Sequence, residues 1–170
     1  LVGRIPTAVE ARAFLVSTDA DKRVVLVDRL IASDAFARHQ ANEFDAFLMT
    51  GTDASVRDYL LTAFQSSRGW NDIFRDILVA DQTSESKSAS EFVKRRVKDT
   101  DKLTNDVSVM FFGVNVSCAK CHDHPLVPEW TQDHFYGMKS FFSRTFENGD
   151  FFGERGYGVV KFKTTDGEER

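Results

Sequence analysis

Residues 114–130 read VNVSCAKCHDHPLVPEW and hold both cysteines of the 170-residue chain, together with two of its four histidines. Cys118 lies three residues before Cys121, and His122 follows directly. On a short helical turn, residues at positions i, i+3 and i+4 share one face. The spacing therefore predicts a turn that presents two thiols and one imidazole on the same side.

This C-x-x-C-H spacing is typical of sites where c-type haem is attached covalently. The sulfur atoms of Cys118 and Cys121 would add to the two vinyl groups of the porphyrin, and the imidazole of His122 would reach the iron. Ser117 is expected to cap the turn. Pro125 is expected to end it, because the residue before a proline avoids the α region. The motif predicts haem c as the cofactor.

Two other chemistries fit the same residues. Cys118 and Cys121 with His122 or His124 would form part of a zinc site, but the sequence offers no second C-x-x-C or H-x-x-x-H to complete it. The cysteines would alternatively pair as a redox disulfide, although no strand–loop–helix pattern of a thioredoxin fold precedes them. Both alternatives stay open on the sequence alone.

His124 is expected to play a structural role. It lies two positions past His122, about 200° around a helix, so it would not bind the same iron from the same turn. Its ring is expected to bond a backbone carbonyl or to pair with Asp123 or Asp133.

The second axial ligand of the iron is not marked by any spacing. Its candidates are the imidazoles and thioethers of His39, Met49, Met110, His134 and Met138. An imidazole would lower the reduction potential and a thioether would raise it, whereas an empty position would admit a small ligand. We favour His39, which lies beside apolar positions on a predicted helix.

The composition is that of an ordinary globular protein, with 42% hydrophobic and 28% charged residues and a net charge of −4. The one basic run, at 94–98, is followed by Asp99 and Asp101 and is interpreted as a solvated helix face. Nucleic acid is therefore not expected as a partner. No apolar run reaches the roughly 20 residues of a membrane span.

Apolar periodicity predicts helices along most of the chain. They are expected over 7–15, 19–33, 34–49, 55–67, 71–79, 91–112 with a break near residue 100, and from 131 or 133 to 144. Thr7 and Glu10 form a capping box at the first of them. The second is expected to place its apolar residues on one face: Val24, Val25, Val27, Leu30 and Ile31.

Two segments do not fit a helix. Residues 81–90 are polar and are interpreted as a loop. Near the C-terminus, Val160, Phe162 and Thr164 alternate with polar residues before Asp166-Gly167, which predicts a strand that enters a hairpin turn. The expected fold is mainly α, one helical domain of six to eight helices over 1–145. A C-terminal extension with the small β element covers 146–170, as part of a longer chain.

Four blocks of the sequence resemble the planctomycete cytochrome c-like domains, specifically the second family of that name. They are GRIPTAVEARAFL (3–15), KRVVLVDRLIASDAFARH (22–39), RGWNDIFRDILVA (68–80) and FFGVNVSCAKCHDHPLVPEWTQDHFYGMKSFFSR (111–144). The resemblance implies haem c attached at Cys118 and Cys121, with His122 as axial ligand, in a long exported protein with further domains. The family often carries Trp and Leu after the ARH block, where this chain has QANEFDAFLMTG.

We therefore expect a mono-haem c-type cytochrome domain that transfers single electrons, more an electron-transfer domain than a catalyst. Haem c is attached outside the cytoplasm, which predicts a periplasmic or equivalent location. The partner is expected to be another redox protein or a neighbouring domain of the same polypeptide. The alternatives are a haem c enzyme or small-ligand sensor with an open distal site, and a non-haem domain with zinc or a disulfide.

Overall fold

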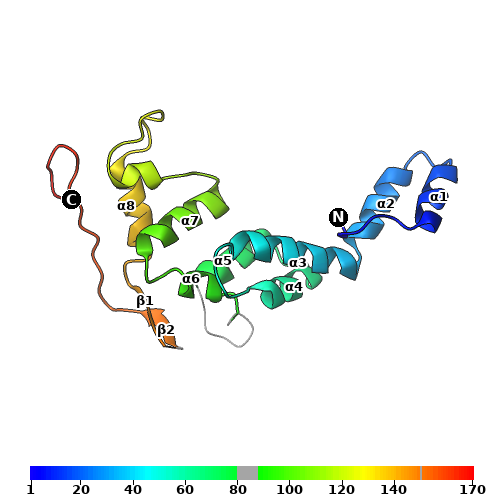
Figure 1. Ribbon diagram of the computed structural model, residues 1–170, viewed down its shortest axis with the longest axis horizontal. Coiled ribbons are helices and arrows are strands. Elements are labelled where there is room, and N and C mark those ends of the chain that lie inside the picture. The colour runs from blue at the N-terminus through cyan, green and yellow to red at the C-terminus, as the bar shows by residue number, and fades with distance from the viewer. Residues whose placement is uncertain (80–87, 150) are drawn as a thin grey trace. The chain divides into compact units, whose positions relative to one another are not determined.

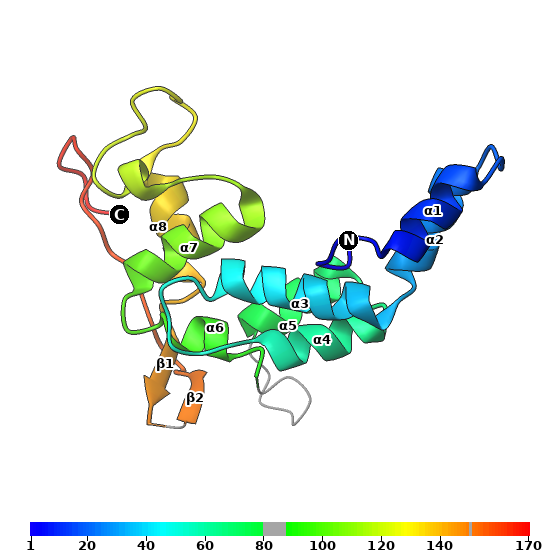
Figure 2. The same cartoon turned by 45° about the vertical axis from the view of Figure 1, so that its right-hand side comes forward.

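The computed structural model describes residues 1–79, 88–149 and 151–170, and Figures 1 and 2 show its elements in two views. The predicted fold, mainly α with a small β element near the C-terminus, is confirmed, and the described residues contain eight α-helices. In chain order the elements are α1 (Ala8–Val16), α2 (Lys22–Ile31), α3 (Asp34–Leu48), α4 (Arg57–Gln65), α5 (Trp70–Val79), α6 (Glu91–Lys94), α7 (Thr100–Phe112), the short 3-10 helix η1 (Ser117–Lys120), α8 (Gln132–Ser140), β1 (Thr145–Asn148) and β2 (Phe151–Glu154).

The chain divides into two compact units, residues 1–75 and 76–170. We call them unit 1 and unit 2, and the boundary between them falls within α5. The expected separation of a C-terminal extension after residue 145 stays a prediction. Residues 80–87 of the predicted polar loop lie outside the described residues.

Unit 1 is built around α3 and α4, which lie side by side in both views (Figures 1 and 2). Small residues let the two helices approach closely, since Ala41 of α3 and Ala63 of α4 are almost fully buried. The carboxylate of Asp45 accepts hydrogen bonds from Ser55 Oγ (2.9 Å) and Val56 N (2.7 Å). This α3 side chain therefore fixes the loop from which α4 begins.

The predicted capping box at the start of α1 is confirmed. Thr7 Oγ1 accepts from Glu10 N (3.2 Å), and Glu10 Oε2 accepts from Thr7 N (2.7 Å). Arg4 adds two hydrogen bonds to the Glu10 carboxylate. These bonds to Arg4 come first among the causes that hold the pKa of Glu10 well below its usual range.

The prediction that α2 has a single apolar face is wrong. Leu26 and Leu30 line a groove together with Phe14 of α1. Val24, Val27 and Ile31 instead lie on an exposed stripe, whereas Val25 lines the side that faces α1 together with Leu26. Neither α1 nor α2 contributes a buried residue. The hairpin of these two helices therefore shields little apolar surface by itself.

Charging this exposed stripe should cost little stability. We expect Val24→Lys, at a side chain 60% exposed, to change the free energy of unfolding by less than about 0.5 kcal/mol. Leu60→Ala, at a fully buried position of α4, should cost about 2–5 kcal/mol because it leaves a cavity. Urea titration followed by circular dichroism measures both. Equal losses in the two variants would contradict this description of α2.

Unit 2 contains α7 and α8, which pack against each other and carry the motif turn between them. The predicted break near residue 100 is confirmed, because α7 begins there with Asp99 accepting from Lys102 N (3.0 Å). Gly113 ends α7 in the left-handed conformation, with φ of 69°, which glycine adopts without steric cost. The chain thus turns sharply just before the cysteine motif.

Arg96 corrects the interpretation of the basic run as a solvated face. Its side chain is 1% exposed, and its Nε lies 2.8 Å from Asp106 Oδ2 of α7. Its Nη1 donates to the carbonyl of Phe92 (3.0 Å), and the guanidinium lies over the Phe92 ring. One member of the run is therefore a paired charge inside unit 2.

The small β element is a two-stranded antiparallel sheet, β1 with β2, which lies before the strand predicted around residues 160–164. Its register runs from Thr145 opposite Glu154 to Asn148 opposite Phe151, around Gly149 at φ 61°. The predicted C-terminal turn is confirmed at 166–167, but its arms form only an isolated bridge, Lys163 with Glu169, rather than regular strands in the described chain.

The described helices include none with the length and hydropathy needed to cross a lipid bilayer.

Candidate functional site

The cysteine motif forms the predicted short helical turn, as the 3-10 helix η1. Cys118 O accepts from Cys121 N (3.2 Å) and from His122 N (3.4 Å). In a 3-10 helix, side chains at i and i+3 eclipse each other. Cys118 and Cys121 therefore lie on the same side of the turn, and both are free and exposed.

The back of this turn is anchored in a small apolar cluster. Val116 and Ala119 are buried against Phe135 of α8, with Val114, Trp130 and Tyr136 packed around them. Because Ala119 points inward, the residues on either side of it face solvent. Ala119 thus faces the cluster, while Cys118, Lys120 and Cys121 are exposed.

The cap of the turn differs from the prediction. Asn115 Oδ1 accepts from the backbone N of Ser117 (3.0 Å) and from its Oγ (2.6 Å). Ser117 is thus the capped residue, and Asn115 supplies the oxygen.

His122 is exposed, and its ring orientation is set by a backbone group. Its Nδ1 lies 2.7 Å from the carbonyl oxygen of Asp123. A carbonyl only accepts, so Nδ1 carries the proton and donates it. In the neutral ring, Nε2 then keeps its lone pair. Histidines that bind metals commonly donate the other ring N–H in this way.

His124 has the expected structural role, but with other partners. Its Nδ1 accepts from Leu126 N (3.2 Å) and Val127 N (3.1 Å), rather than donating to a carbonyl or a carboxylate. Its own backbone N donates to Trp130 O (2.8 Å). His124 therefore shapes the loop that returns the chain to α8.

Asp101 ties the motif turn to the helices behind it. From the first turn of α7, its carboxylate pairs with Lys120 of the turn (2.8 Å) and with Lys139 of α8 (2.6 Å). Burial acts to raise the pKa of Asp101, but hydrogen bonds and charge from the two lysines outweigh it and hold this pKa below its usual value. Tyr136 adds a second tie, donating to Lys120 O (3.0 Å).

The stability that the ion pairs of Asp101 contribute should depend on pH. We expect Asp101→Asn to lower the free energy of unfolding at pH 7 by about 1 kcal/mol, a modest value because the side chain is 31% exposed. A carboxylate with a lowered folded pKa stabilises the fold above its unfolded pKa of about 4, and this contribution is lost as pH falls through the folded pKa.

The difference between wild type and Asp101→Asn should therefore be smaller at about pH 3 than at pH 7. Urea titrations at both pH values measure it. Asp58→Asn, at a side chain 90% exposed, is the control and should show little difference at either pH. A loss in Asp101→Asn that is as large in acid as at pH 7 would contradict the assigned ion pairs.

The candidates for the second axial ligand fall in both units. Met110 on α7, Met138 on α8 and His134 lie in the unit that carries the motif, whereas His39 on α3 and Met49 lie in unit 1. The preference for His39 stays a prediction.

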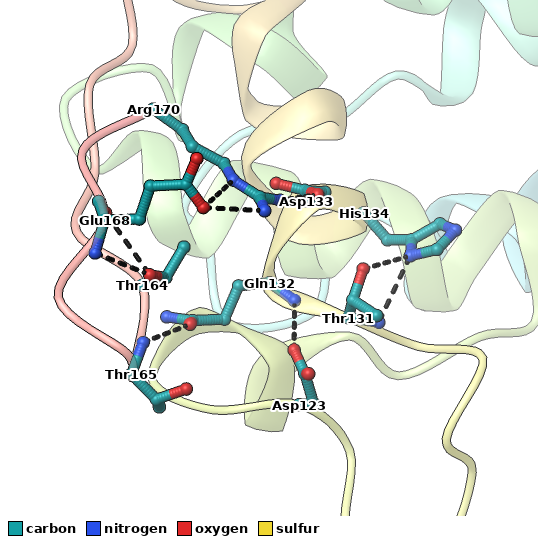
Figure 3. A network of polar contacts seen from close by, with 9 residues as sticks. All are labelled: Asp123, Thr131, Gln132, Asp133, His134, Thr164, Thr165, Glu168 and Arg170. Carbon is teal, nitrogen blue, oxygen red and sulfur yellow. Dashed lines mark hydrogen bonds and ion pairs between the residues drawn. The ribbon is translucent and has the colours of Figure 1, made fainter.

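His134 and His39 are both engaged in local contacts. His134 Nδ1 accepts from Thr131 N (3.2 Å) in the capping box that begins α8 (Figure 3). His39 Nδ1 lies 3.7 Å from Glu43 Oε1 on the same helix. A Cβ added at Gly3 would come within 2.8 Å of that ring nitrogen, so glycine allows the N-terminal segment to pass close to His39.

Across the described ranges, no three His, Cys, Asp or Glu side chains are grouped so that they would hold a metal ion by themselves. Cys118, Cys121 and His122 therefore lie together on one turn without forming a closed ligand cage.

One family model matches most of the chain. It is PSCyt2, described as a protein of unknown function (DUF1549), and it matches residues 1–147. No curated protein and no solved structure matches.

Proposed function

The chain belongs to the PSCyt2 family of proteins of unknown function, and we propose that it is a mono-haem c-type cytochrome domain that transfers single electrons. Thioether bonds from Cys118 and Cys121 would hold haem c, with His122 as an axial ligand. One observation carries the proposal. The motif turn places two free thiols on one side, followed by an imidazole whose Nδ1 is already bonded and whose Nε2 is available.

The donor set fits haem better than it fits zinc. A structural zinc ion takes four protein ligands, and a catalytic one takes three plus water. A porphyrin supplies four nitrogens of its own, so the protein adds only one or two axial ligands. In haem c the two thiols bond to the edge of the porphyrin and not to the iron, so the motif has to supply only one iron ligand, the imidazole of His122. His124 does not complete a zinc site either. Its Nδ1 accepts two backbone hydrogen bonds, so in the neutral ring the proton lies on Nε2 and neither nitrogen offers a free lone pair.

When bound, the haem would supply an iron that takes up and returns one electron. The chain's own part is to hold and orient the ligand groups. The Asp123 carbonyl fixes the ring of His122, and the buried pair Val116 and Ala119 keeps water from the inner side of the turn. Tyr136 and Asp101 restrain the turn through Lys120.

The location and partner belong to the same proposal. Both cysteines of the chain lie in the motif, which suits an exported protein because spare thiols would oxidise outside the cytoplasm. The electron donor or acceptor would be a redox protein or a neighbouring domain of the same polypeptide.

The test is to produce the protein in a host with haem-attachment machinery, alongside a known c-type cytochrome that shows the machinery works. We expect a haem stain that stays with the polypeptide on a denaturing gel, and a redox titration with a one-electron slope. A polypeptide without haem, beside a loaded control cytochrome, would refute the proposal. A high-spin spectrum that shifts on adding cyanide would instead favour an enzyme or sensor with an open distal position.

A further inference from the structure

The C-terminal residues form a small hairpin that lies beyond residue 147, where the family match ends. Phe162 and Arg170 exchange two backbone hydrogen bonds, each of 3.0 Å. Thr164 N donates to Glu168 O (2.9 Å), and Gly167 occupies the turn at φ 86°. We call residues 162–170 the C-terminal hairpin (Figure 3).

This hairpin is attached to the first half of α8 at three positions. Thr165 N donates to Gln132 Oε1 (3.0 Å), and Arg170 forms an ion pair with Asp133. The ring of Phe162 stacks on that of Tyr136 at 4.0 Å, with 10° between the planes. Gln132 is 5% exposed, so the bond from Thr165 reaches a buried side chain.

The same part of α8 also contacts the motif. Gln132 N donates to Asp123 Oδ1 (2.9 Å, Figure 3), and Asp123 is the residue that follows His122 in the chain. Tyr136, whose ring is stacked on Phe162, donates its hydroxyl to Lys120 O (3.0 Å). Two residues, Gln132 and Tyr136, therefore connect the hairpin on one side with the motif turn on the other.

The contact with Asp123 bears directly on the ring of His122. The peptide unit between Asp123 and His124 accepts from His122 Nδ1 through its carbonyl and donates to Trp130 O through its N–H. The orientation of His122 thus depends on how firmly this single peptide is held. Groups that fix a ligating histidine from behind commonly affect metal affinity as strongly as 10–100-fold.

We infer that the C-terminal hairpin is a positioning element for His122, acting through Gln132 and Tyr136 on the peptide whose carbonyl accepts the hydrogen bond from Nδ1. The role of His122 as an axial ligand rests on the proposed function. The mechanical connection from hairpin to motif rests only on the contacts above.

The test uses Phe162→Ala and Gln132→Ala, with Phe141→Ala as a matched aromatic control at a side chain 74% exposed. In protein without haem, amide hydrogen exchange is measured by NMR at Cys121, His122 and His124. We expect exchange there to rise about fivefold or more in both variants, because Gln132→Ala loses the hydrogen bond from Thr165 and Phe162→Ala loses the stacked ring. Phe141→Ala should not change it, and Phe162→Tyr, which keeps the stacked ring, should restore it.

The amide of Val107, in the buried middle of α7, reports whether the unit stays folded and should exchange as in wild type. In haem-loaded protein, the midpoint potential should shift in Phe162→Ala and return in Phe162→Tyr. Unchanged exchange at the three motif amides in both hairpin variants would overturn the inference. Wild-type protein that never takes up haem would overturn the proposed function instead, while the exchange rates would still decide whether the hairpin holds the turn.

Discussion

The Cys118→Ser/Cys121→Ser double variant is expected to carry no covalently bound haem when it is produced in a host that loads the wild-type chain. A serine hydroxyl does not form the thioether that a thiol forms with a vinyl group. Because both side chains are exposed, the fold should tolerate the change within about 0.5 kcal/mol. The loss would therefore report on attachment and not on unfolding. Intact-mass measurement after denaturation distinguishes the two forms by one haem.

Ser117→Ala is the matched control, since Ser117 adjoins the motif and is also exposed. It should be loaded like the wild type. Each single cysteine variant should keep one thioether bond and give less haem-loaded protein. His122→Ala should keep both thioether bonds and change the absorption spectrum of the haem, because the iron loses an axial ligand. A double variant that is loaded as fully as the wild type would contradict the role of both thiols.

Arg96→Ala is expected to produce the largest loss of stability, about 3–5 kcal/mol, because it leaves the partly buried carboxylate of Asp106 without its inner partner. Lys102 would still reach Asp106 at 2.6 Å, but from a side chain that is 56% exposed. The variant also loses the hydrogen bond to Phe92 O and the packing over that ring.

Arg95→Ala is the control one residue away. Its side chain is 43% exposed, and its ion pair with Glu91 should contribute less than about 1 kcal/mol. Urea unfolding followed by the fluorescence of Trp130, in a Trp70→Phe background, reports on unit 2 specifically. Similar midpoints for the two alanine variants would show that the buried ion pair does not hold the unit together.

Local signals predicted the helices well. The capping box at Thr7 and Glu10 and the start of α8 after Thr131 depend only on residues three positions apart, so the sequence contains the whole interaction. The motif turn was predicted for the same reason, because the spacing of Cys118 and Cys121 places them together in either a 3-10 or an α-helical turn.

Interactions between distant residues were not predictable in this way. Arg96 looks like part of a charged surface until α7 brings Asp106 against it. The second contact of Asp123, with Gln132 nine residues later, depends on how the intervening loop folds back. The β1–β2 pairing was missed because its strands are only four residues each, too short for alternation to be recognised.

The eclipsed arrangement of Cys118 and Cys121 has a consequence for how such a protein is made. Two reduced sulfurs on one side of a single turn are well placed to give up two electrons and two protons to an oxidant and close on each other. An exported chain would meet that oxidant before maturation is complete. Haem attachment would then compete with disulfide formation, and a reductant must keep both thiols reduced until the porphyrin arrives.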